Sequence, residues 1–224
     1  MSKQYLYKKI DTVIFDMDGT TINTLVDLAN AVNYVLSTFG FPTHRVEEYR
    51  KWFGNGIRYA IRCAVPSNTS EETIDKMLPV FKEYYGVHCL DETRPYEGIL
   101  DLMKVLKEHG YKMAIVSNKI DPAVKELNNK FFKDYVDVAI GERDGIRRKP
   151  APDTVIEALK ELGSKEETSI YIGDSEVDFE TANNSHLPSI LVLWGFRDKD
   201  YLIKIGAKEF ANTPMDIFDI LQNK

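Results

Sequence analysis

Short apolar runs rich in β-branched residues alternate along the chain with amphipathic helical patterns, and this alternation narrows the possible folds more than any other feature. The runs that predict strands are Thr12–Phe15, Lys112–Val116, Val136–Ile140, Ser169–Ile172 and Ser189–Leu193. Strands that alternate with helices usually form a parallel sheet covered on both faces. We therefore expect an α/β fold with a three-layer core built on a parallel sheet.

The segments between these runs carry the apolar periodicity of helices. One face is formed by Ile99, Leu102, Met103 and Leu106, and another by Val155, Ile156, Leu159 and Leu162. Gly110 and Gly163 follow these segments, where a glycine commonly ends a helix. A last helix is expected over Met215–Leu221.

The interval between residues 22 and 95 breaks the alternation, because it contains no convincing strand pattern. Helices are expected there over residues 25–39, 46–53, 56–64 and 71–85. A helical block of this size, inserted after the first strand, is typical of a second small domain. We expect a catalytic core made of residues 1–21 and 96–224, and an α-helical cap domain made of residues 22–95.

Charge and composition exclude several classes of partner. The net charge of -6 disfavours nucleic acid and anionic membranes, and no apolar run reaches the roughly 18 residues of a membrane span. Cys63 and Cys89 are far apart and have no metal or redox spacing. The N-terminal stretch does not look like a signal peptide. These features lead us to expect a cytoplasmic protein, with neither nucleic acid nor membrane as a partner.

Polar side chains follow three of the predicted strands at the point where each strand ends. Asp16 and Asp18 follow the first strand, Ser117 and Asn118 follow the second, and Asp174 follows the fourth. In an open parallel sheet, ligands bind outside the carboxyl ends of the strands. The residues are therefore expected to meet at one edge of the sheet, together with Lys149 from the loop after the third strand.

This set of groups suits phosphoryl transfer. Converging carboxylates require a cation, and oxygen ligands favour Mg²⁺. Asp16 is a competent nucleophile toward phosphorus, and Asp18 could protonate the leaving alkoxide and then deprotonate a water molecule. Lys149 could balance the phosphate charge and Ser117 could donate to its oxygens. Gly19 permits a tight turn close to the phosphate.

The same motifs resemble those of the haloacid dehalogenase superfamily, in the order that this family shows. They are DMDGT at 16–20, Ser117, Lys149 within RKPAPD, and GDSEVD at 173–178. The helical insert is placed like the cap of the α-helical cap subclass. The segments GFP at 40–42, GNG at 54–56 and LWGFRD at 193–198 are similar to bacterial phosphoglycolate phosphatases.

The resemblance implies a Rossmann-like core with strand order 5-4-1-2-3 and a role for each matching residue. Asp16 would be the nucleophile and a Mg²⁺ ligand, and Asp18 the acid and base, with its backbone carbonyl on the metal. Asp174 would be a further metal ligand. The residues implied to hold the phosphoryl group are Gly19, Thr20, Ser117, Asn118 and Lys149, and those implied to support the metal or Lys149 from behind are Ser175 and Asp178. Thr21 and Asn23 depart from the family pattern, at positions that are not catalytic.

The cap offers a weaker signal in Gly54-Asn55-Gly56, which precedes a predicted helix. Asn55, Gly56 and Arg58 could face an anionic substrate, because a helix N-terminus and an arginine both bind anions. The alternative is a glycine-rich turn between helices with a solvated arginine.

These inferences lead us to expect a Mg²⁺-dependent phosphomonoester hydrolase of a small phosphorylated metabolite, phosphoglycolate or something like it, acting as a monomer or homodimer. A sugar phosphomutase of the β-phosphoglucomutase type and a pyrophosphatase are the alternatives. A non-catalytic relative that binds a phosphometabolite is a third, although every core motif residue is present.

Overall fold

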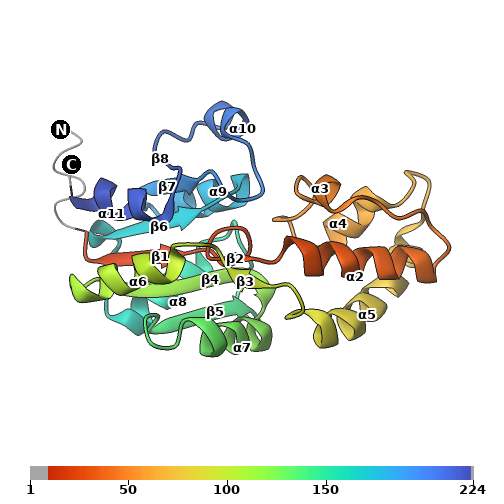
Figure 1. Cartoon of the computed structure of the whole chain (residues 1–224), viewed down its shortest axis with the longest axis horizontal. Coiled ribbons are helices and arrows are strands. Elements are labelled where there is room, and N and C mark those ends of the chain that lie inside the picture. Colours follow the sequence, from red (N-terminus) through yellow and green to blue (C-terminus); the bar gives the residue numbers. More distant parts are fainter. Residues whose placement is uncertain (1–9, 223–224) are drawn as a thin grey trace. The chain divides into compact units, whose positions relative to one another are not determined.

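The computed structural model describes residues 10–222, so residues 1–9 and 223–224 of the expected core lie outside the described residues. Contacts divide the chain into two compact units. One consists of Met1–Thr21 and Pro95–Lys224, and we call it the core unit. The other is Ile22–Arg94, which we call the helical unit. The helices and strands of both units are labelled in Figure 1.

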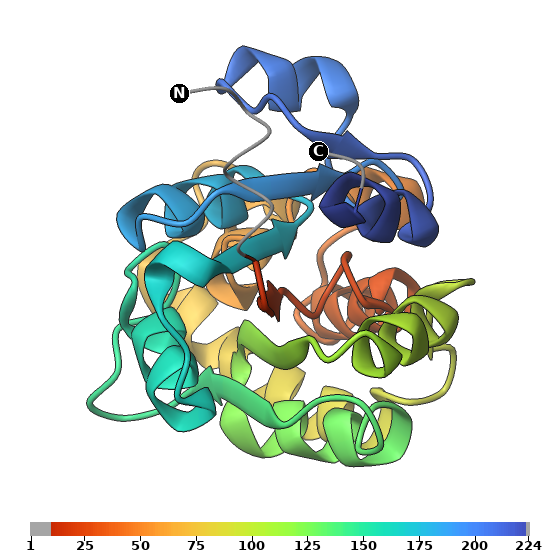
Figure 2. The ribbon, with the colours of Figure 1, turned by 90° about the vertical axis from the view of Figure 1, so that its left-hand side faces the viewer.

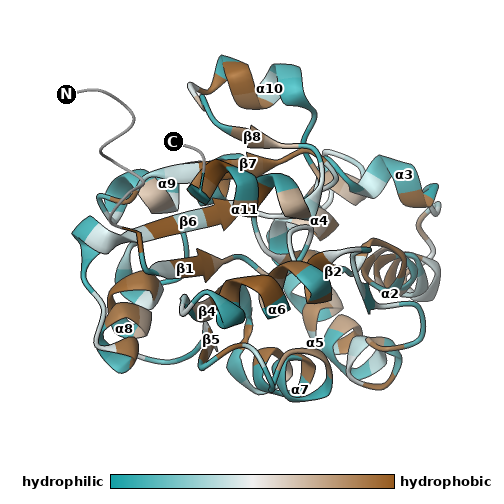
Figure 3. Ribbon diagram, turned by 60° about the vertical axis from the view of Figure 1, so that its left-hand side comes forward, coloured by the Kyte–Doolittle hydropathy of each residue, from teal (hydrophilic) through white to brown (hydrophobic). Residues whose placement is uncertain are grey.

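A parallel six-stranded sheet in the order β5-β4-β1-β6-β7-β8 forms the centre of the core unit. Its strands are β1 (Thr12–Phe15), β4 (Lys112–Ile120), β5 (Val138–Glu142), β6 (Ser169–Gly173), β7 (Ser189–Val192) and β8 (Phe210–Ala211). All residues of β1 are buried, as expected for a strand with neighbours on both sides and helices on both faces. Apolar residues are accordingly concentrated on the central strands, which are covered on both faces (Figure 3).

The predicted α/β class and parallel sheet are confirmed, but the strand order differs in one respect. If the five predicted strands are numbered along the chain, the order read from β7 to β5 is 5-4-1-2-3. Beyond β7 the sheet continues into β8, which the sequence did not predict. A strand of two residues is too short to show an alternating pattern.

Helices cover both faces of this sheet. They are α6 (Ile99–Glu108), α7 (Asp121–Phe131), α8 (Asp153–Leu162), α9 (Glu176–Asn184), α10 (Lys199–Lys204) and α11 (Pro214–Gln222), with a short 3-10 helix at Glu166–Thr168. Val155 and Ala158 of α8 and Ala182 of α9 pack with Ile14 and Tyr171 of the sheet. Helices α6 and α11 contact each other on the opposite face (Figure 2). Gly163 ends α8 in the left-handed conformation, with φ of 61°, as its position predicted.

Strand β4 is longer than predicted and contains an irregularity that matters for the site. The prediction ended at Val116, whereas the strand runs to Ile120. Val116 pairs with Ile140 of β5, and the next pair joins Ile120 to Glu142. Four steps on β4 therefore face two on β5, so residues 117–119 bulge out of the regular ladder. Bulges of this kind redirect side chains at the ends of strands.

The helical unit is built from α2 (Leu25–Thr38), α3 (Val46–Tyr49), α4 (Ile57–Ala64) and α5 (Glu71–His88). Helix α2 packs on α5, and the rings of Tyr34 and Tyr84 stack with centroids 4.1 Å apart. The expectation of no strand in this interval was wrong, because β2 (Ile22–Asn23) and β3 (Arg94–Pro95) pair at its two ends. Both are two residues long, so no periodicity could reveal them. In the described part of the chain, none of the helices combines the length and apolarity needed to cross a membrane.

Candidate active site

The loop after β1 places two aspartates at the mouth of the central strand. Asp16 is buried, and its backbone N–H donates to the carbonyl of Ile172 at 2.8 Å, which extends the ladder between β1 and β6. Gly19 turns the chain with φ of 92°, and a side chain there would collide with the carboxylate of Asp174. Glycine at this position therefore allows the loop after β1 to lie against the loop after β6.

Lys149 is buried between carboxylates instead of being an ordinary solvated lysine. Its Nζ lies 2.5 Å from Asp16 Oδ1 and 2.8 Å from Asp178 Oδ1, and it donates to the hydroxyl of Tyr171 at 3.1 Å. Burial lowers the pKa of an ammonium, but Asp16 and Asp178 hold the pKa of Lys149 well above its ordinary value. Lys149 therefore carries a fixed positive charge at the end of β1.

Asp178 holds this arrangement in place from the first turn of α9. Its Oδ2 accepts the backbone N–H groups of Asp174 and Ser175, each at 3.1 Å, and the Ser175 hydroxyl at 2.7 Å. Its Oδ1 accepts from Lys149 and from the Tyr171 hydroxyl. Burial raises the pKa of Asp178, but these donors, with Lys149 the strongest, lower it overall. Both oxygens are thus engaged with protein donors.

Asp16, Asp174 and Asp178 form a buried acidic cluster in which each offers an oxygen within 4.8 Å of the others. Burial, and then the charge of Asp178, raises the pKa of Asp16 to about 7 and that of Asp174 well above its usual range. This is the signature of negative charge that the protein alone does not balance. Oxygen ligands of this kind fit Mg²⁺. Asp16 and Asp174 are the better placed ligands, because Asp178 already accepts from several donors.

Each of the remaining predicted side chains contacts either an aspartate of the site or the backbone of Lys149. Thr20 Oγ1 donates to Asp16 Oδ2 at 3.2 Å, and Ser117 Oγ lies 3.4 Å from Asp18 Oδ2. The amide of Asn118 donates to the carbonyl of Lys149 at 3.1 Å, so Asn118 anchors the lysine loop. Gly19, Thr20, Ser117, Asn118 and Lys149 are therefore brought together with the carboxylates, as the strand-end argument predicts.

Sequence reasoning missed four residues of this neighbourhood: Lys119, Tyr171, Glu176 and Arg197. Lys119 Nζ lies 3.1 Å from Asp18 Oδ1. The Arg197 side chain is buried and binds Glu176, with Nε at 2.6 Å and Nη2 at 2.8 Å. Lys119 follows Ser117 by two residues, so strand alternation could have placed both side chains on one face. The other contacts join distant segments and leave no local signal.

The loop after β7 contacts both the loop after β1 and the loop after β6. The N–H of Phe196 donates to Asp174 Oδ2 at 2.5 Å, and the indole N–H of Trp194 donates to the carbonyl of Thr20 at 3.0 Å. A side chain at Gly195 would collide with Asp174 and with the carbonyl of Gly19. The segment LWGFRD therefore braces the loops after β1 and β6, and the Arg197–Glu176 pair ties it to α9.

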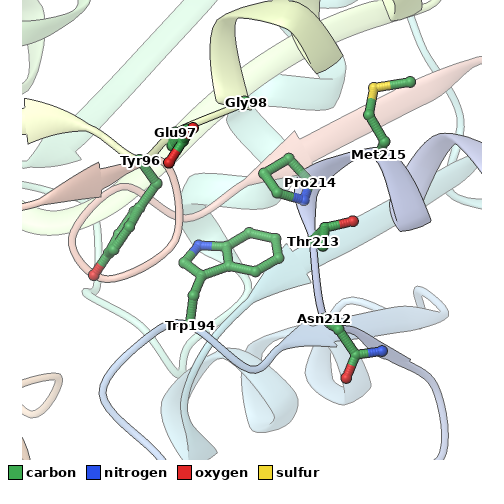
Figure 4. Close-up of a pocket in the computed structure, with 8 residues that line it drawn as sticks. All are labelled: Tyr96, Glu97, Gly98, Trp194, Asn212, Thr213, Pro214 and Met215. Carbon is green, nitrogen blue, oxygen red and sulfur yellow. The ribbon is translucent and has the colours of Figure 1, made fainter.

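Trp194 also lines a pocket of about 410 Å³. Its lining comes from the start of α6, from Trp194 and from the start of α11, and Figure 4 shows these residues as sticks: Tyr96, Glu97, Gly98, Trp194, Asn212, Thr213, Pro214 and Met215. The Tyr96 and Trp194 rings have centroids 6.3 Å apart. None of the acidic residues of the cluster lines this pocket, so it is separate from the site described above.

The candidate residues of the helical unit lie at the start of α4. Gly56 precedes the helix with φ of 83°. Arg58 binds two carboxylates of α5, with Nη1 2.7 Å from Glu71 Oε2 and Nη2 2.9 Å from Asp75 Oδ1, and all three side chains are exposed. A role for Asn55, Gly56 and Arg58 in binding substrate stays a prediction, and Arg58 would have to exchange these partners to fulfil it.

Comparison with known proteins gives a consistent result across sequence and structure. A family model described as haloacid dehalogenase-like hydrolase matches residues 13–192. A phosphoglycolate phosphatase of Aquifex aeolicus is 29% identical, over 94% of this chain and 96% of the relative. Pyrophosphatase PpaX of Halalkalibacterium halodurans is also 29% identical, over 95% and 97% of the two chains. The crystal structure of a predicted phosphoglycolate phosphatase from Lactobacillus delbrueckii superimposes with a TM-score of 0.93, at 38% identity, over 96% of this chain and all of that one.

Proposed function

The chain belongs to the haloacid dehalogenase-like hydrolase family and is one of its phosphatases, and on this premise we propose that it is a Mg²⁺-dependent phosphomonoester hydrolase of a small phosphorylated metabolite. Asp16 carries the phosphoryl group as an aspartyl-phosphate. The observation that supports this proposal most strongly is the placement of Asp16 at the end of β1, next to buried Lys149 and within reach of Asp174.

In the first step a carboxylate oxygen of Asp16 attacks phosphorus, and the bond from phosphorus to the leaving oxygen breaks. Asp18 gives its proton to that oxygen, so the product leaves as an alcohol. Lys149, Thr20 and Ser117 surround the position of the transferred group, where they balance and orient its oxygens.

In the second step a water oxygen attacks the phosphorus of the aspartyl-phosphate. Asp18 takes the proton from this water, and the bond between phosphorus and Asp16 breaks to release inorganic phosphate. Asp16 and Asp174, with the backbone carbonyl of Asp18, would hold Mg²⁺. When bound, this ion supplies positive charge for the phosphoryl oxygens and for the acidic cluster.

The helical unit is inserted between β1 and α6, so its first connection follows Thr20 and Thr21 of the loop after β1 directly. We assign it the role of a cap that excludes water during the first step. Cap residues would then select the substrate, and Asn55, Gly56 and Arg58 are the candidates for this role.

The relatives give two candidate substrates. One relative is named for phosphoglycolate and another for pyrophosphate, and each of these relatives aligns with nearly the whole chain. We favour a phosphoglycolate-like monoester and keep pyrophosphate as the second candidate, because a relative of equal identity carries that name. We propose a cytoplasmic monomer or homodimer, because Cys63 and Cys89 have no metal or redox spacing.

A titration with p-nitrophenyl phosphate tests the proposal. Turnover should require Mg²⁺, and EDTA should abolish it. Asp16→Asn, which keeps the shape and removes the nucleophile, should lower kcat by about 10⁴-fold or more. Asp198→Asn is a matched control, because Asp198 is exposed at the start of α10 and its side chain makes no capping hydrogen bond. The proposal fails if the wild type shows no turnover, or if Asp16→Asn turns over as fast as the Asp198→Asn control.

A further inference from the structure

The core unit places a second lysine at the site, in addition to the one that the family motif contains. Lys119 lies in the bulge of β4, two residues after Ser117. Its side chain is only 7% exposed, and its Nζ lies 3.1 Å from Asp18 Oδ1. Burying an ammonium group is costly unless an anion compensates it. Lys119 is therefore not an ordinary solvated lysine, and its burial beside Asp18 suggests a role in the site.

The two lysines face different aspartates. Lys149 contacts Asp16 and Asp178, whereas Lys119 contacts Asp18. In the proposed reaction, Asp16 attacks phosphorus and Asp18 protonates the oxygen that leaves. An ammonium group bonded to Asp18 thus lies beside the leaving oxygen and the part of the substrate attached to it. Lys149, by contrast, lies beside the nucleophile.

We infer that Lys119 is a specificity-determining residue that binds an anionic group on the leaving group of the substrate. The inference rests on the proposed function and deepens it by naming the substrate class. That class consists of phosphoryl compounds whose leaving group carries a carboxylate or phosphate within a few bonds of the scissile oxygen. When this anion takes the ammonium group of Lys119, Asp18 is released from its ion pair and its carboxyl is available to the leaving oxygen.

The charges of the site support this assignment. The carboxylates of Asp16, Asp18, Asp174 and Asp178 converge here, with Lys149 and Lys119 as their neighbouring ammonium groups. A substrate with two anionic groups adds negative charge at two places, and each needs a cation. The two names carried by the relatives agree with this class, because phosphoglycolate has a carboxylate and pyrophosphate has a second phosphate on the leaving side.

A pair of substrates with leaving groups of equal length tests the inference. 2-Phosphoglycolate releases a two-carbon alcohol that carries a carboxylate, and ethyl phosphate releases a two-carbon alcohol that does not. The wild type should prefer 2-phosphoglycolate in kcat/KM by about 10- to 100-fold, as expected for a hydrogen bond between charged groups. Pyrophosphate and methyl phosphate form a second pair, which distinguishes a phosphate from a carboxylate as the anion.

Lys119→Met should remove most of this preference. We expect the loss in kcat/KM for the anionic substrates to exceed the loss for ethyl phosphate by about 10- to 100-fold. Lys119→Arg, which keeps the charge, should retain part of the preference. Inhibition of ethyl phosphate hydrolysis by glycolate should weaken in Lys119→Met, which gives a binding readout separate from the chemical step. Lys125→Met on the exposed face of α7 is the control, because it also removes an ammonium paired with an aspartate.

The outcomes separate this inference from the proposed function. If the wild type hydrolyses the substrates but has no preference within either pair, the inference is wrong and the proposed function stands. The same holds if Lys119→Met loses equal activity on ethyl phosphate and 2-phosphoglycolate, because Lys119 then serves Asp18 alone. If the wild type hydrolyses no phosphoryl compound, both are wrong. Should Lys119→Met not fold, the wild-type preference and Lys119→Arg decide the matter.

Discussion

In the core unit, the buried carboxylates of Asp16, Asp174 and Asp178 crowd together beside the ammonium of Lys149. In the helical unit, the buried carboxylate of Asp27 accepts backbone N–H groups of Glu92 and Thr93, at 2.9 to 3.1 Å. The first arrangement puts like charges together, which a protein designed for stability alone would avoid. The second satisfies each oxygen with neutral donors and fastens the end of the unit to α2.

The difference separates functional charge from structural charge. Asp16 and Asp174 have raised pKa values because burial, and then the charge of Asp178, opposes the ionisation of both carboxyls. Such unbalanced charge needs a ligand, whereas Asp27 already has its partners. The ion pairs of Arg58 with Glu71 and Asp75 are a third arrangement of charge. They lie on the surface, where an ion pair contributes little to stability.

The largest effect should follow from Lys149→Met in the core unit. It removes the cation from beside Asp16 and Asp178, so kcat/KM should fall by about 10³-fold, as for the loss of a group that stabilises transition-state charge. Stability at neutral pH should fall by about 3–5 kcal/mol, because buried carboxylates lose their partner. Steady-state kinetics and urea unfolding measure the two. A variant with full activity would show that the buried charge of the core unit is structural.

The pH dependence of metal binding should show the raised pKa of Asp16. A proton and Mg²⁺ compete for this carboxylate, so Mg²⁺ affinity should weaken by about tenfold per pH unit as pH falls below 7. Isothermal titration calorimetry between pH 5.5 and 8.5 would reveal this.

The sign of the stability change without metal follows from the same shift. The unfolded chain releases the Asp16 proton near its ordinary pKa of 3.8, whereas the folded chain holds it to about 7. In EDTA, stability should therefore fall as pH rises from about 4 to 7. Stability in EDTA that does not fall over this pH range would contradict the account.

Asp27→Ala should destabilise the helical unit without a comparable effect on chemistry. Its removal leaves the N–H groups of Glu92 and Thr93 without their acceptor, at a cost of about 2–3 kcal/mol for hydrogen bonds to a charged group. Asp27→Asn, which keeps one carbonyl oxygen, should lose less. Turnover of p-nitrophenyl phosphate by the folded fraction should change by at most about threefold. A loss of turnover as large as that of Lys149→Met would erase the distinction between the two units.

Glu176→Gln should have a smaller effect, because Glu176 acts on the cluster through Arg197. The pair holds the loop that gives the Phe196 N–H to Asp174, so weakening it should lower stability by about 1–2 kcal/mol and loosen Mg²⁺ binding severalfold. A double-mutant cycle with Arg197→Met, followed by Mg²⁺ titration, measures the coupling. Additive effects would mean that the two side chains act independently.

The smallest effect should come from Glu71→Gln on the surface of the helical unit. Its pairs with Arg58 and Arg62 are exposed to solvent, so the melting temperature should stay within about 2 °C of the wild type. Differential scanning calorimetry at low and moderate salt checks this. A larger shift would show that the surface pairs contribute to the stability of the unit.

Strand ends could be predicted because the signal is local. Asp16, Asp18 and Asp174 each come at or shortly after the end of a buried apolar run, so the topology of a parallel sheet brings them together. The brace formed by Trp194 and Phe196 could not be foreseen, because its donors lie far in sequence from Thr20 and Asp174. Short elements such as β2, β3 and β8 were missed for the opposite reason, since two residues contain no period.

The position of Lys119 could be predicted in part. Its alternation with Ser117 was visible, but the bulge that carries residues 117–119 depends on the register of β4 against β5. Register arises from pairing between strands and not from either strand alone. This is also why the predicted end of β4 at Val116 fell short of Ile120.

The central claim is that the charge buried in the core unit exists for phosphoryl transfer through Asp16. The most direct test is to mix the enzyme with Mg²⁺ and substrate, quench with acid within the first turnover, and locate any phosphoryl adduct by peptide mass spectrometry. The account predicts an adduct on the peptide that contains Asp16, and none in Asp16→Asn. Turnover without such an adduct, or an adduct on another residue, would contradict it.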